Sequence, residues 1–213
     1  MNRQTGNQIM DFDRENGYGG LLILLQMINA EVESIITFGE YTQNLKTDNE
    51  KTPIEWIVLS KENDQLLLIS RYALDCKQYN TSRIDVTWED STLHKWLIND
   101  FYNNAFDSTE QGFIVISNVP ADKNLKHLTN PGNDTEDKVF LLSIDEVKQY
   151  FSSDNERVAK FNGEADWWWL RSPGNIGEYA ALVNSIGCVY ISGIDVGSGY
   201  GGIRPALWVN LTS

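Results

Sequence analysis

The chain has 213 residues, of which 41% are hydrophobic and 11% are aromatic, so it can bury a sizeable core and is not a disordered protein. Its formal net charge is -13, and such a surface repels both the phosphate backbone of nucleic acids and anionic membranes. We therefore expect a folded protein that binds no nucleic acid and does not insert into a membrane.

Residues 1–20 are polar and rich in glycine and asparagine, and their acidic residues do not fit the start of a secretory signal. The apolar run that follows, residues 19–30, is too short to span a bilayer. Apolar residues recur there at helical spacing, which predicts an amphipathic helix: Leu21, Leu24, Leu25, Ile28 and Val32. We assign residues 1–33 to a lead-in with this helix and residues 34–213 to a single domain.

The next part of the chain predicts short strands and one long helix. Four segments rich in branched and aromatic residues predict strands, the second and third of them as a hairpin: residues 34–41, 53–60, 64–70 and 112–117. Residues 87–106 (TWEDSTLHKWLINDFYNNAF) predict the clearest helix, with Thr87 as its N-cap. Apolar residues line one face of this helix: Leu93, Trp96, Leu97 and Phe101.

Residues 118–137 are polar and contain two prolines, so we expect a long loop of a kind that often carries function. Residues 138–143 (KVFLLS) predict a strand after this loop. Ser143 and Glu146 then have the spacing of a capping box, which predicts the start of a short helix that runs toward Phe151.

The last third of the chain predicts strands. Residues 166–174 (DWWWLRSPG) predict one, residues 179–192 predict two around a turn at 184–187, and residues 201–211 (GGIRPALWVNL) predict the last. Pro205 cannot donate a ladder hydrogen bond, so we expect a bulge or an unpaired edge there. Helices in the first half and a β-meander in the second indicate an α+β protein.

Five blocks in this order resemble a bacterial family of domains of unknown function: PIEWIVL, TWEDSTLHKWL, KVFLLSIDEV, WWWLRSPG and GGIRPALWVN. That family is similar to the C-type-lectin-like superfamily, which includes formylglycine-generating-enzyme-like domains. The resemblance implies a C-type-lectin-like fold, in which two main helices flank a twisted antiparallel sheet with the 166–174 and 201–211 strands at its centre. The chain departs from the pattern in its third tryptophan, where a pair is usual, and at His94, where arginine is commoner.

Two arginines next to the tryptophans admit two interpretations. Arg171 and Arg204 could present guanidinium groups to an anionic ligand, with indoles stacked beside them. They could instead be buried, bonded to carboxylates or carbonyl oxygens and stacked on the indoles. We favour this structural interpretation, in which Trp168, Trp169 and both arginines are scaffold, and we expect at least two of the indoles of residues 167–169 to be buried.

The sequence offers little support for a catalytic or metal site. Cys76 and Cys188 are interpreted as small buried residues, with a disulfide as the alternative. Formylglycine-type oxidation would need a pair of reactive cysteines that hold copper, and Cys188 has no neighbouring partner in the sequence. Oxygen ligands for Ca²⁺ occur in the long loop, although a solvated acidic loop is favoured: Asn130, Asn133, Asp134, Glu136 and Asp137.

We therefore expect a non-catalytic module that binds a protein or a carbohydrate through loops at 118–137, 174–179 and 192–201. Tyr179, Asp195 and Tyr200 are the expected contact residues, and no metal or cofactor is assigned. One alternative is an oxidase of the formylglycine-generating kind or a drifted relative. A second is a structural interaction domain of a larger bacterial system, in which the apolar stripe between Leu21 and Val32 docks a partner.

Overall fold

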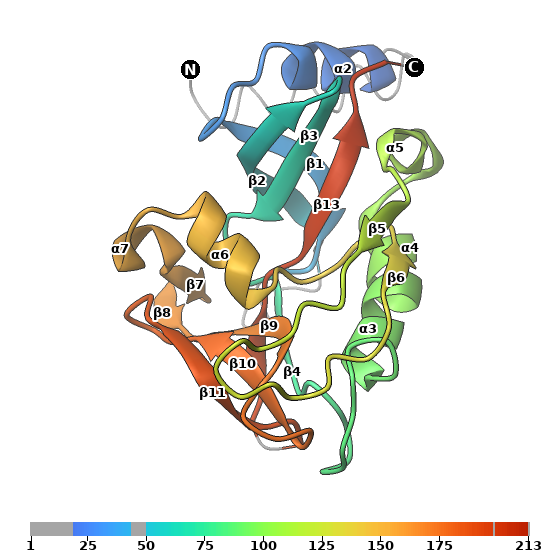
Figure 1. The fold of residues 1–213 in the computed structure, drawn as a ribbon. Coiled ribbons are helices and arrows are strands. Elements are labelled where there is room, and N and C mark those ends of the chain that lie inside the picture. The colour runs from blue at the N-terminus through green and yellow to red at the C-terminus, as the bar shows by residue number, and fades with distance from the viewer. Residues whose placement is uncertain (1–18, 44–49, 198, 213) are drawn as a thin grey trace.

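Two curled β-sheets form the centre of the protein in the computed structural model, which describes residues 19–43, 50–197 and 199–212 (Figure 1). The first sheet has the order β1-β2-β3-β13: β1 (Ile35–Tyr41), β2 (Thr52–Glu62), β3 (Gln65–Ser70) and β13 (Ala206–Asn210). The second has the order β11-β10-β9-β12-β4: β4 (Asp75–Lys77), β9 (Trp168–Pro173), β10 (Tyr179–Val183), β11 (Val189–Asp195) and β12 (Gly201–Ile203). The fold is therefore mixed α+β, as expected.

Helices and two short hairpins surround the sheets. The helices are α2 (Gly19–Ile28), α3 (Thr92–Trp96), η1 (Leu97–Phe101), α4 (Tyr102–Ala105), α5 (Ser108–Phe113), α6 (Ile144–Tyr150) and α7 (Asp154–Arg157). The hairpins are β5 (Ser117–Val119) with β6 (Thr135–Asp137), and β7 (Ala159–Phe161) with β8 (Glu164–Asp166). Figure 1 shows α3 and α4 on one side of the sheets and α6 and α7 on the other. No described helix has the length and apolar character that crossing a membrane requires.

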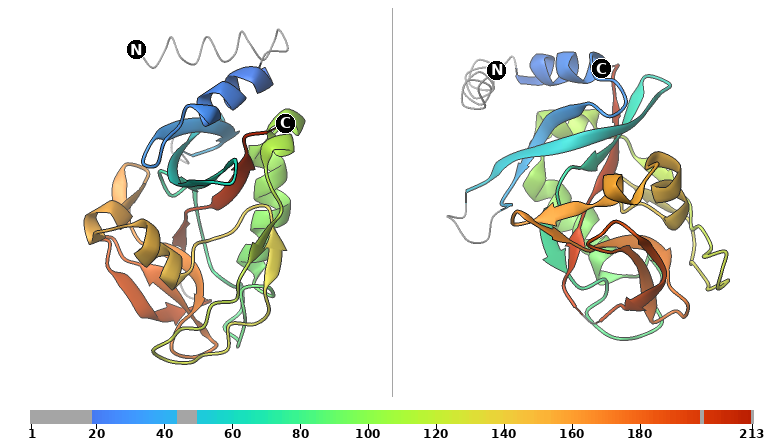
Figure 2. Two further views of the ribbon diagram at one scale, coloured as in Figure 1. Left: turned by 45° about the horizontal axis from the view of Figure 1, so that its top comes forward. Right: turned by 90° about the vertical axis from the view of Figure 1, so that its left-hand side faces the viewer.

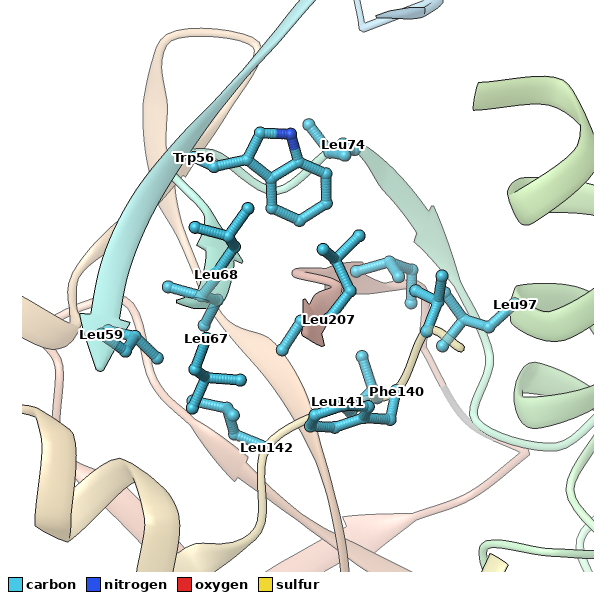
Figure 3. Close-up of a cluster of buried hydrophobic side chains, with 14 of the residues drawn as sticks. Trp56, Leu59, Leu67, Leu68, Leu74, Leu97, Phe140, Leu141, Leu142 and Leu207 are labelled. Carbon is cyan, nitrogen blue, oxygen red and sulfur yellow. The ribbon is translucent and has the colours of Figure 1, made fainter. Parts of the chain in front are cut away.

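The core lies between the first sheet and the elements that face it. Figure 3 shows Trp56 from β2 and Leu68 from β3 beside Leu207 from β13. Phe140 and Leu141, which precede α6, close the same cluster. The hydrophobic effect of this burial, at about 25 cal/mol per Å² of apolar surface, is the main force that joins the sheets to the segments around them.

Local signals in the sequence identify several elements correctly. The β2–β3 hairpin is confirmed, and its two-residue turn uses Asn63 and Asp64, both with positive φ, as a tight hairpin turn requires. The capping box of α6 is confirmed, because Ser143 Oγ accepts a hydrogen bond from the Glu146 amide at 3.2 Å. The β10–β11 hairpin is confirmed as well.

The long helix is real, but its predicted start is wrong. Ser91, and not Thr87, is the N-cap, because Ser91 Oγ accepts a hydrogen bond from the His94 amide at 3.0 Å. Residues before Ser91 form a turn, in which the Ser91 amide donates to the Thr87 carbonyl oxygen. Both residue types cap helices well, so the sequence alone does not decide between them.

Two predicted strands are wrong. Much of the segment 112–117 is not a strand, because α5 extends to Phe113 after a capping box of Asp107 and Glu110. The segment 138–143 makes only an isolated bridge, from Phe140 to Ala206, and its apolar side chains are buried in the core. An apolar run signals burial, and burial does not require a ladder of hydrogen bonds.

The last predicted strand is two strands in different sheets. β12 pairs with β9 and β4 inside the second sheet, whereas β13 is the edge strand beside β3 in the first sheet, so the 201–211 segment is central only in its β12 part. The chain changes sheet at Arg204 and Pro205, where the Pro205 carbonyl oxygen accepts a hydrogen bond from the Ser70 amide at 2.9 Å. The expected interruption at Pro205 is confirmed. β12 runs parallel to β9, so the second sheet is not wholly antiparallel.

The order of elements also differs from the expectation, because four strands occur before the first residue of α3.

In α2 the buried residues are Ile23 and Met27, whereas Leu21 and Leu25 of the predicted stripe are exposed. The exposed part of the stripe therefore faces away from the core. The helix contacts the first sheet through Gln26, whose side-chain amide donates to the Thr37 carbonyl oxygen at 2.8 Å.

Candidate functional site

The tryptophan strand is part of the core. Trp168 and Trp169 are both 0% exposed, so the expected burial of at least two indoles is confirmed. Their N–H groups donate to carbonyl oxygens: Trp168 to Arg157 at 3.0 Å and Trp169 to Lys77 at 2.9 Å. Trp167 is half-buried, and its ring meets that of Trp169 edge-on with 4.8 Å between the centroids. These contacts occupy both the faces and the polar atoms of the indoles.

Arg171 is buried and bonded to the protein on every side. Its guanidinium makes a two-point ion pair with Glu146, in which Nη2 lies 3.0 Å from Oε1. Nη1 also donates to the Leu141 carbonyl oxygen at 2.9 Å, and Nη2 donates to that of Pro120 at 3.3 Å. Asp122 lies farther away, with 3.4 Å between Oδ2 and Nη2. Arg171 thus connects β9 to α6 and to the long loop.

Arg204 is buried, and among the described residues no carboxylate pairs with it. Its guanidinium packs against aromatic rings instead. Its guanidinium carbon lies 5.0 Å from the centroid of the Trp168 ring and 5.4 Å from that of Phe151. Its Nε donates to the Ser70 carbonyl oxygen at 2.8 Å. Burial lowers the pKa of Arg204 to about 9, so the side chain remains protonated at neutral pH. Cation–π attraction offsets part of the cost of burying this charge.

Loops gather at one end of the five-stranded sheet, at the lower end of Figure 1. Backbone and side-chain hydrogen bonds join them: the Val86 amide donates to the Gly177 carbonyl oxygen at 3.1 Å, and the Asn80 amide donates to that of Val196 at 2.9 Å. Thr129 Oγ1 also donates to the Gly174 carbonyl oxygen, at 2.7 Å. We call this surface the loop end: residues 80–87, 120–134, 174–179 and 195–197.

The structure brings together two of the three expected contact residues. Tyr179 and Asp195 are partners across β10 and β11, so their side chains share a face of the sheet. Arg83 pairs with both Asp195, at 2.7 Å, and Glu178, at 2.9 Å. The hydrogen bond that Arg83 donates to Glu178 and the charge of Asp195 raise the pKa of Arg83. Tyr200 has another neighbour, because its carbonyl oxygen accepts a hydrogen bond from the Cys76 thiol.

Sequence reasoning missed Arg83, although a cation between two predicted elements of an acidic chain is a usable signal. The side chain of Arg83 is exposed, and it links the β4–α3 connection to the β10–β11 hairpin. An exposed ion pair of this kind contributes little to stability, because water and salt screen the attraction. Its position therefore matters more for the shape and charge of the loop end than for the fold.

We predict that alanine substitutions at the expected contact residues leave the fold intact. Tyr200 is 69% exposed, so Tyr200→Ala should change the free energy of unfolding by no more than about 0.5 kcal/mol. Tyr179 is half-buried, so Tyr179→Ala should cost no more than about 1 kcal/mol. Urea unfolding followed by fluorescence measures both values. An unfolded variant would show that the residue belongs to the scaffold.

A buried His94–Asp137 pair lies beneath the loop end. His94 Nε2 is 2.7 Å from Asp137 Oδ1, and His94 Nδ1 is 3.1 Å from the Glu89 carbonyl oxygen. Asp137 Oδ2 accepts further hydrogen bonds from Trp88 Nε1, at 3.2 Å, and from Thr135 Oγ1, at 2.7 Å. The pair ties α3 to the end of the long loop. Asp137 therefore bonds to a histidine, His94, at the position where arginine is commoner in the family that the sequence resembles.

Asp137 should make stability depend on pH in the acid range. Burial raises the pKa of Asp137, but hydrogen bonds from His94, Thr135 and Trp88 and the nearby His94 outweigh burial, so the pKa lies below its ordinary value. The carboxylate therefore stabilises the fold above the unfolded-state pKa of about 3.9, and this contribution is lost as pH falls through the folded-state value.

The variant Asp137→Asn should remove this contribution. Its free energy of unfolding should lie about 1–3 kcal/mol below that of the parent at neutral pH, and the difference should shrink below about pH 4. Urea unfolding at several pH values measures the difference. Asp100→Asn, at an exposed position of η1, is the control and should show no such trend. A constant difference at all pH values would contradict the assignment.

The cysteines are free and half-buried, so their interpretation as buried residues is wrong. Burial, followed by the charges of Asp166 and Asp75, raises the pKa of Cys76 to about 11. The Cys188 thiol donates to Asp154 Oδ2 at 3.0 Å, and this hydrogen bond raises the pKa of Cys188. Raised pKa values disfavour the thiolate, which is the nucleophile and the metal ligand.

The oxygen-rich part of the long loop makes hydrogen bonds within the protein. Asn133 Nδ2 donates to Glu89 Oε1 at 3.0 Å, and Asp134 Oδ1 accepts from the Ala121 amide at 2.8 Å. Asp137 faces His94. Across the part of the chain that the structure describes, three or more histidine, cysteine or acidic residues nowhere gather as metal ligands would. Asp134 and Asp137 of the loop thus bond to different partners within the protein.

Comparisons with known proteins place the chain in a family. No curated protein and no solved structure gives a significant match to the chain. Residues 63–211 match the model of a family described as a domain of unknown function, DUF6273. The match begins at the β2–β3 turn, extends into the residue after β13, and includes Trp168, Arg171 and Arg204. Because it covers more than half of the chain, the protein belongs to the DUF6273 family.

Proposed function

We propose that the protein is a non-catalytic binding module with a C-type-lectin-like fold, and that it contacts its ligand through the loop end. The buried indoles and arginines support this proposal, because their polar atoms already have partners within the protein. An outside ligand would have to displace core contacts to reach them. Recognition is therefore better served by the loops that stand on this scaffold.

One observation carries the proposal: the loop end exposes large apolar side chains from segments that hydrogen bonds hold in place. Ile84 and Ile176 are 53% and 46% exposed, and the Val86–Gly177 hydrogen bond joins their segments. Leu125 and Leu128 project from the neighbouring long loop. Exposed apolar side chains that gather in one place are typical of a surface that binds protein or carbohydrate.

The contacts of the cysteines favour a binding module over an oxidase. Cys76 donates to the Tyr200 carbonyl oxygen and Cys188 donates to Asp154, so the two thiols have different partners. Both have raised pKa values, which oppose formation of a thiolate pair at neutral pH. Copper-dependent oxidation of the formylglycine type would instead need two cysteines that lie together and form thiolates readily.

The structure of α2 favours a second candidate, an interaction domain that docks through this helix. Met27 is buried in the core, whereas one side of the helix exposes three apolar residues, Leu21, Leu25 and Ile28, and Val32 is exposed in the turn that follows. Figure 1 and Figure 2 show α2 at the end of the molecule opposite the loop end. Leu25→Ser with Ile28→Ser tests this surface without removing Met27. A change in oligomeric state or partner binding would support it.

A screen with a matched control tests the proposed function. The protein is applied to a glycan array and to a phage library of random peptides. The affinity of each selected ligand is then measured for the parent and for the double variant Ile84→Ser/Ile176→Ser. The affinity of the variant should be about tenfold lower, as expected for the loss of apolar contacts at a binding surface. Ile186→Ser is the control, because Ile186 is exposed at the opposite end of the β10–β11 hairpin. Unchanged affinity in the loop-end variant, or no ligand of either class, would contradict the proposal.

A further inference from the structure

The long loop presents two exposed leucines close together in sequence. Leu125 is 76% exposed and Leu128 is 72% exposed, the highest values among the large apolar residues described. Leu128 has φ +57°, a left-handed conformation that leucine rarely adopts. The surrounding structure must therefore hold this segment in place. We call residues 123–129 the docking loop.

Buried polar contacts fix the docking loop to the five-stranded sheet. Asn124 is buried, and its side-chain Nδ2 donates to the carbonyl oxygens of Pro173, at 3.0 Å, and Ile191, at 2.7 Å. The Asn124 carbonyl oxygen accepts a hydrogen bond from the Leu128 amide at 2.7 Å, which closes the turn. His127 Nε2 lies 3.3 Å from Ser192 Oγ. A loop held in this way loses little conformational entropy when it binds.

The docking loop is locally basic on an acidic protein. Lys123 and Lys126 are exposed, and residues 123–133 contain no aspartate or glutamate. The whole chain, in contrast, has a formal net charge of -13. The acids on either side have partners within the protein: Asp122 faces the Arg171 guanidinium, and Asp134 accepts a hydrogen bond from the Ala121 amide. The charged residues nearest to the two leucines in the sequence are therefore lysines.

We infer that the docking loop binds a polypeptide segment that combines apolar side chains with aspartate or glutamate, an inference that rests on the proposed function. Leu125 and Leu128 would insert among the apolar side chains, and Lys123 and Lys126 would pair with the carboxylates. The net negative charge of the chain opposes binding of such a segment elsewhere, so the two lysines favour this loop. An anionic membrane is disfavoured, because it would approach much more of the acidic surface than a peptide does.

The test selects short random peptides on phage with the parent protein and measures the selected peptides by fluorescence anisotropy. The selected sequences should be rich in acidic and apolar residues. Leu125→Ser/Leu128→Ser should weaken binding about tenfold or more. Lys123→Gln/Lys126→Gln should weaken binding and reduce its salt dependence. Ile116→Ser, at an exposed apolar residue outside the docking loop, should change nothing.

The outcomes separate this inference from the proposed function. Peptides that need Ile84 and Ile176 but not Leu125 and Leu128 would overturn the inference and leave the function standing. Selection of basic peptides would overturn it as well. Phosphatidylserine vesicles that bind through the two leucines, in place of any peptide, would overturn it in favour of a membrane. Failure to bind any peptide would also overturn it, and the glycan array would then decide the proposed function.

Discussion

Arg204→Ala should lower the free energy of unfolding by about 3–5 kcal/mol, which for a protein of this size lowers the melting temperature by about 6–20 °C. The substitution removes a fully buried side chain from between Trp168 and Phe151 and leaves a cavity. It also leaves the Ser70 carbonyl oxygen without the hydrogen bond from Arg204 Nε. Thermal and urea unfolding measure the loss.

Two further substitutions show which part of Arg204 matters. Arg204→Met fills most of the space without charge or hydrogen bonds, so it should lose about half as much stability as Arg204→Ala. Arg71→Ala is the control, because Arg71 makes a more exposed ion pair with Glu55 and should cost only about 0–1 kcal/mol. If Arg204→Ala melts like the parent, the guanidinium is not part of the scaffold.

Glu146→Ala should have the second large effect, about 3–5 kcal/mol. Glu146 makes the two-point ion pair with buried Arg171. Its Oε2 also accepts a hydrogen bond from the Ser143 amide at 2.8 Å, as part of the capping box of α6. Without it, a buried guanidinium keeps its desolvation cost and loses its main counter-charge. Urea unfolding measures the change.

Asp122 provides the matched control for this prediction. Its carboxylate also faces Arg171, but at 3.4 Å and from a more exposed position. Asp122→Ala should therefore cost only about 0–1 kcal/mol. If Asp122→Ala and Glu146→Ala cost the same, the ion pair between Arg171 and Glu146 does not anchor α6 to the strand. A small cost in both variants would also contradict the structural role of Arg171.

The sequence predicts elements well where the signal is local. The hairpin of β2 and β3 and the capping box of Ser143 and Glu146 depend on residues close together in the sequence, and both are confirmed. The same holds for the burial of Trp168 and Trp169, because three consecutive indoles cannot all face solvent at low cost.

Predictions fail where distant residues decide the outcome. The segment 138–143 has the composition of a strand, but its one bridge to another strand in the described residues joins Phe140 to Ala206, which is remote in sequence. The change of sheet at Pro205 depends on the position of Ser70. In α2, the apolar residues are so many that periodicity does not decide which face is buried, and the first sheet selects Ile23 and Met27.

The candidate site was predictable only in outline. The expected loops do gather at one end, and Tyr179 and Asp195 share a face because their strands pair in register. Arg83 joins them from a loop remote in sequence, which no local pattern shows. The anchoring of the docking loop is also non-local, since Asn124 bonds to Pro173 and Ile191.

Hydrogen exchange of the indole N–H groups, followed by NMR, tests most directly whether the tryptophan cluster is scaffold. Trp168 and Trp169 bond to backbone carbonyl oxygens and are fully buried, so their indole protons should exchange only through global unfolding, among the slowest in the protein. Half-buried Trp96 and Trp208 are internal references and should exchange faster. Exchange of Trp168 and Trp169 as fast as these references would show an accessible groove and contradict the scaffold assignment.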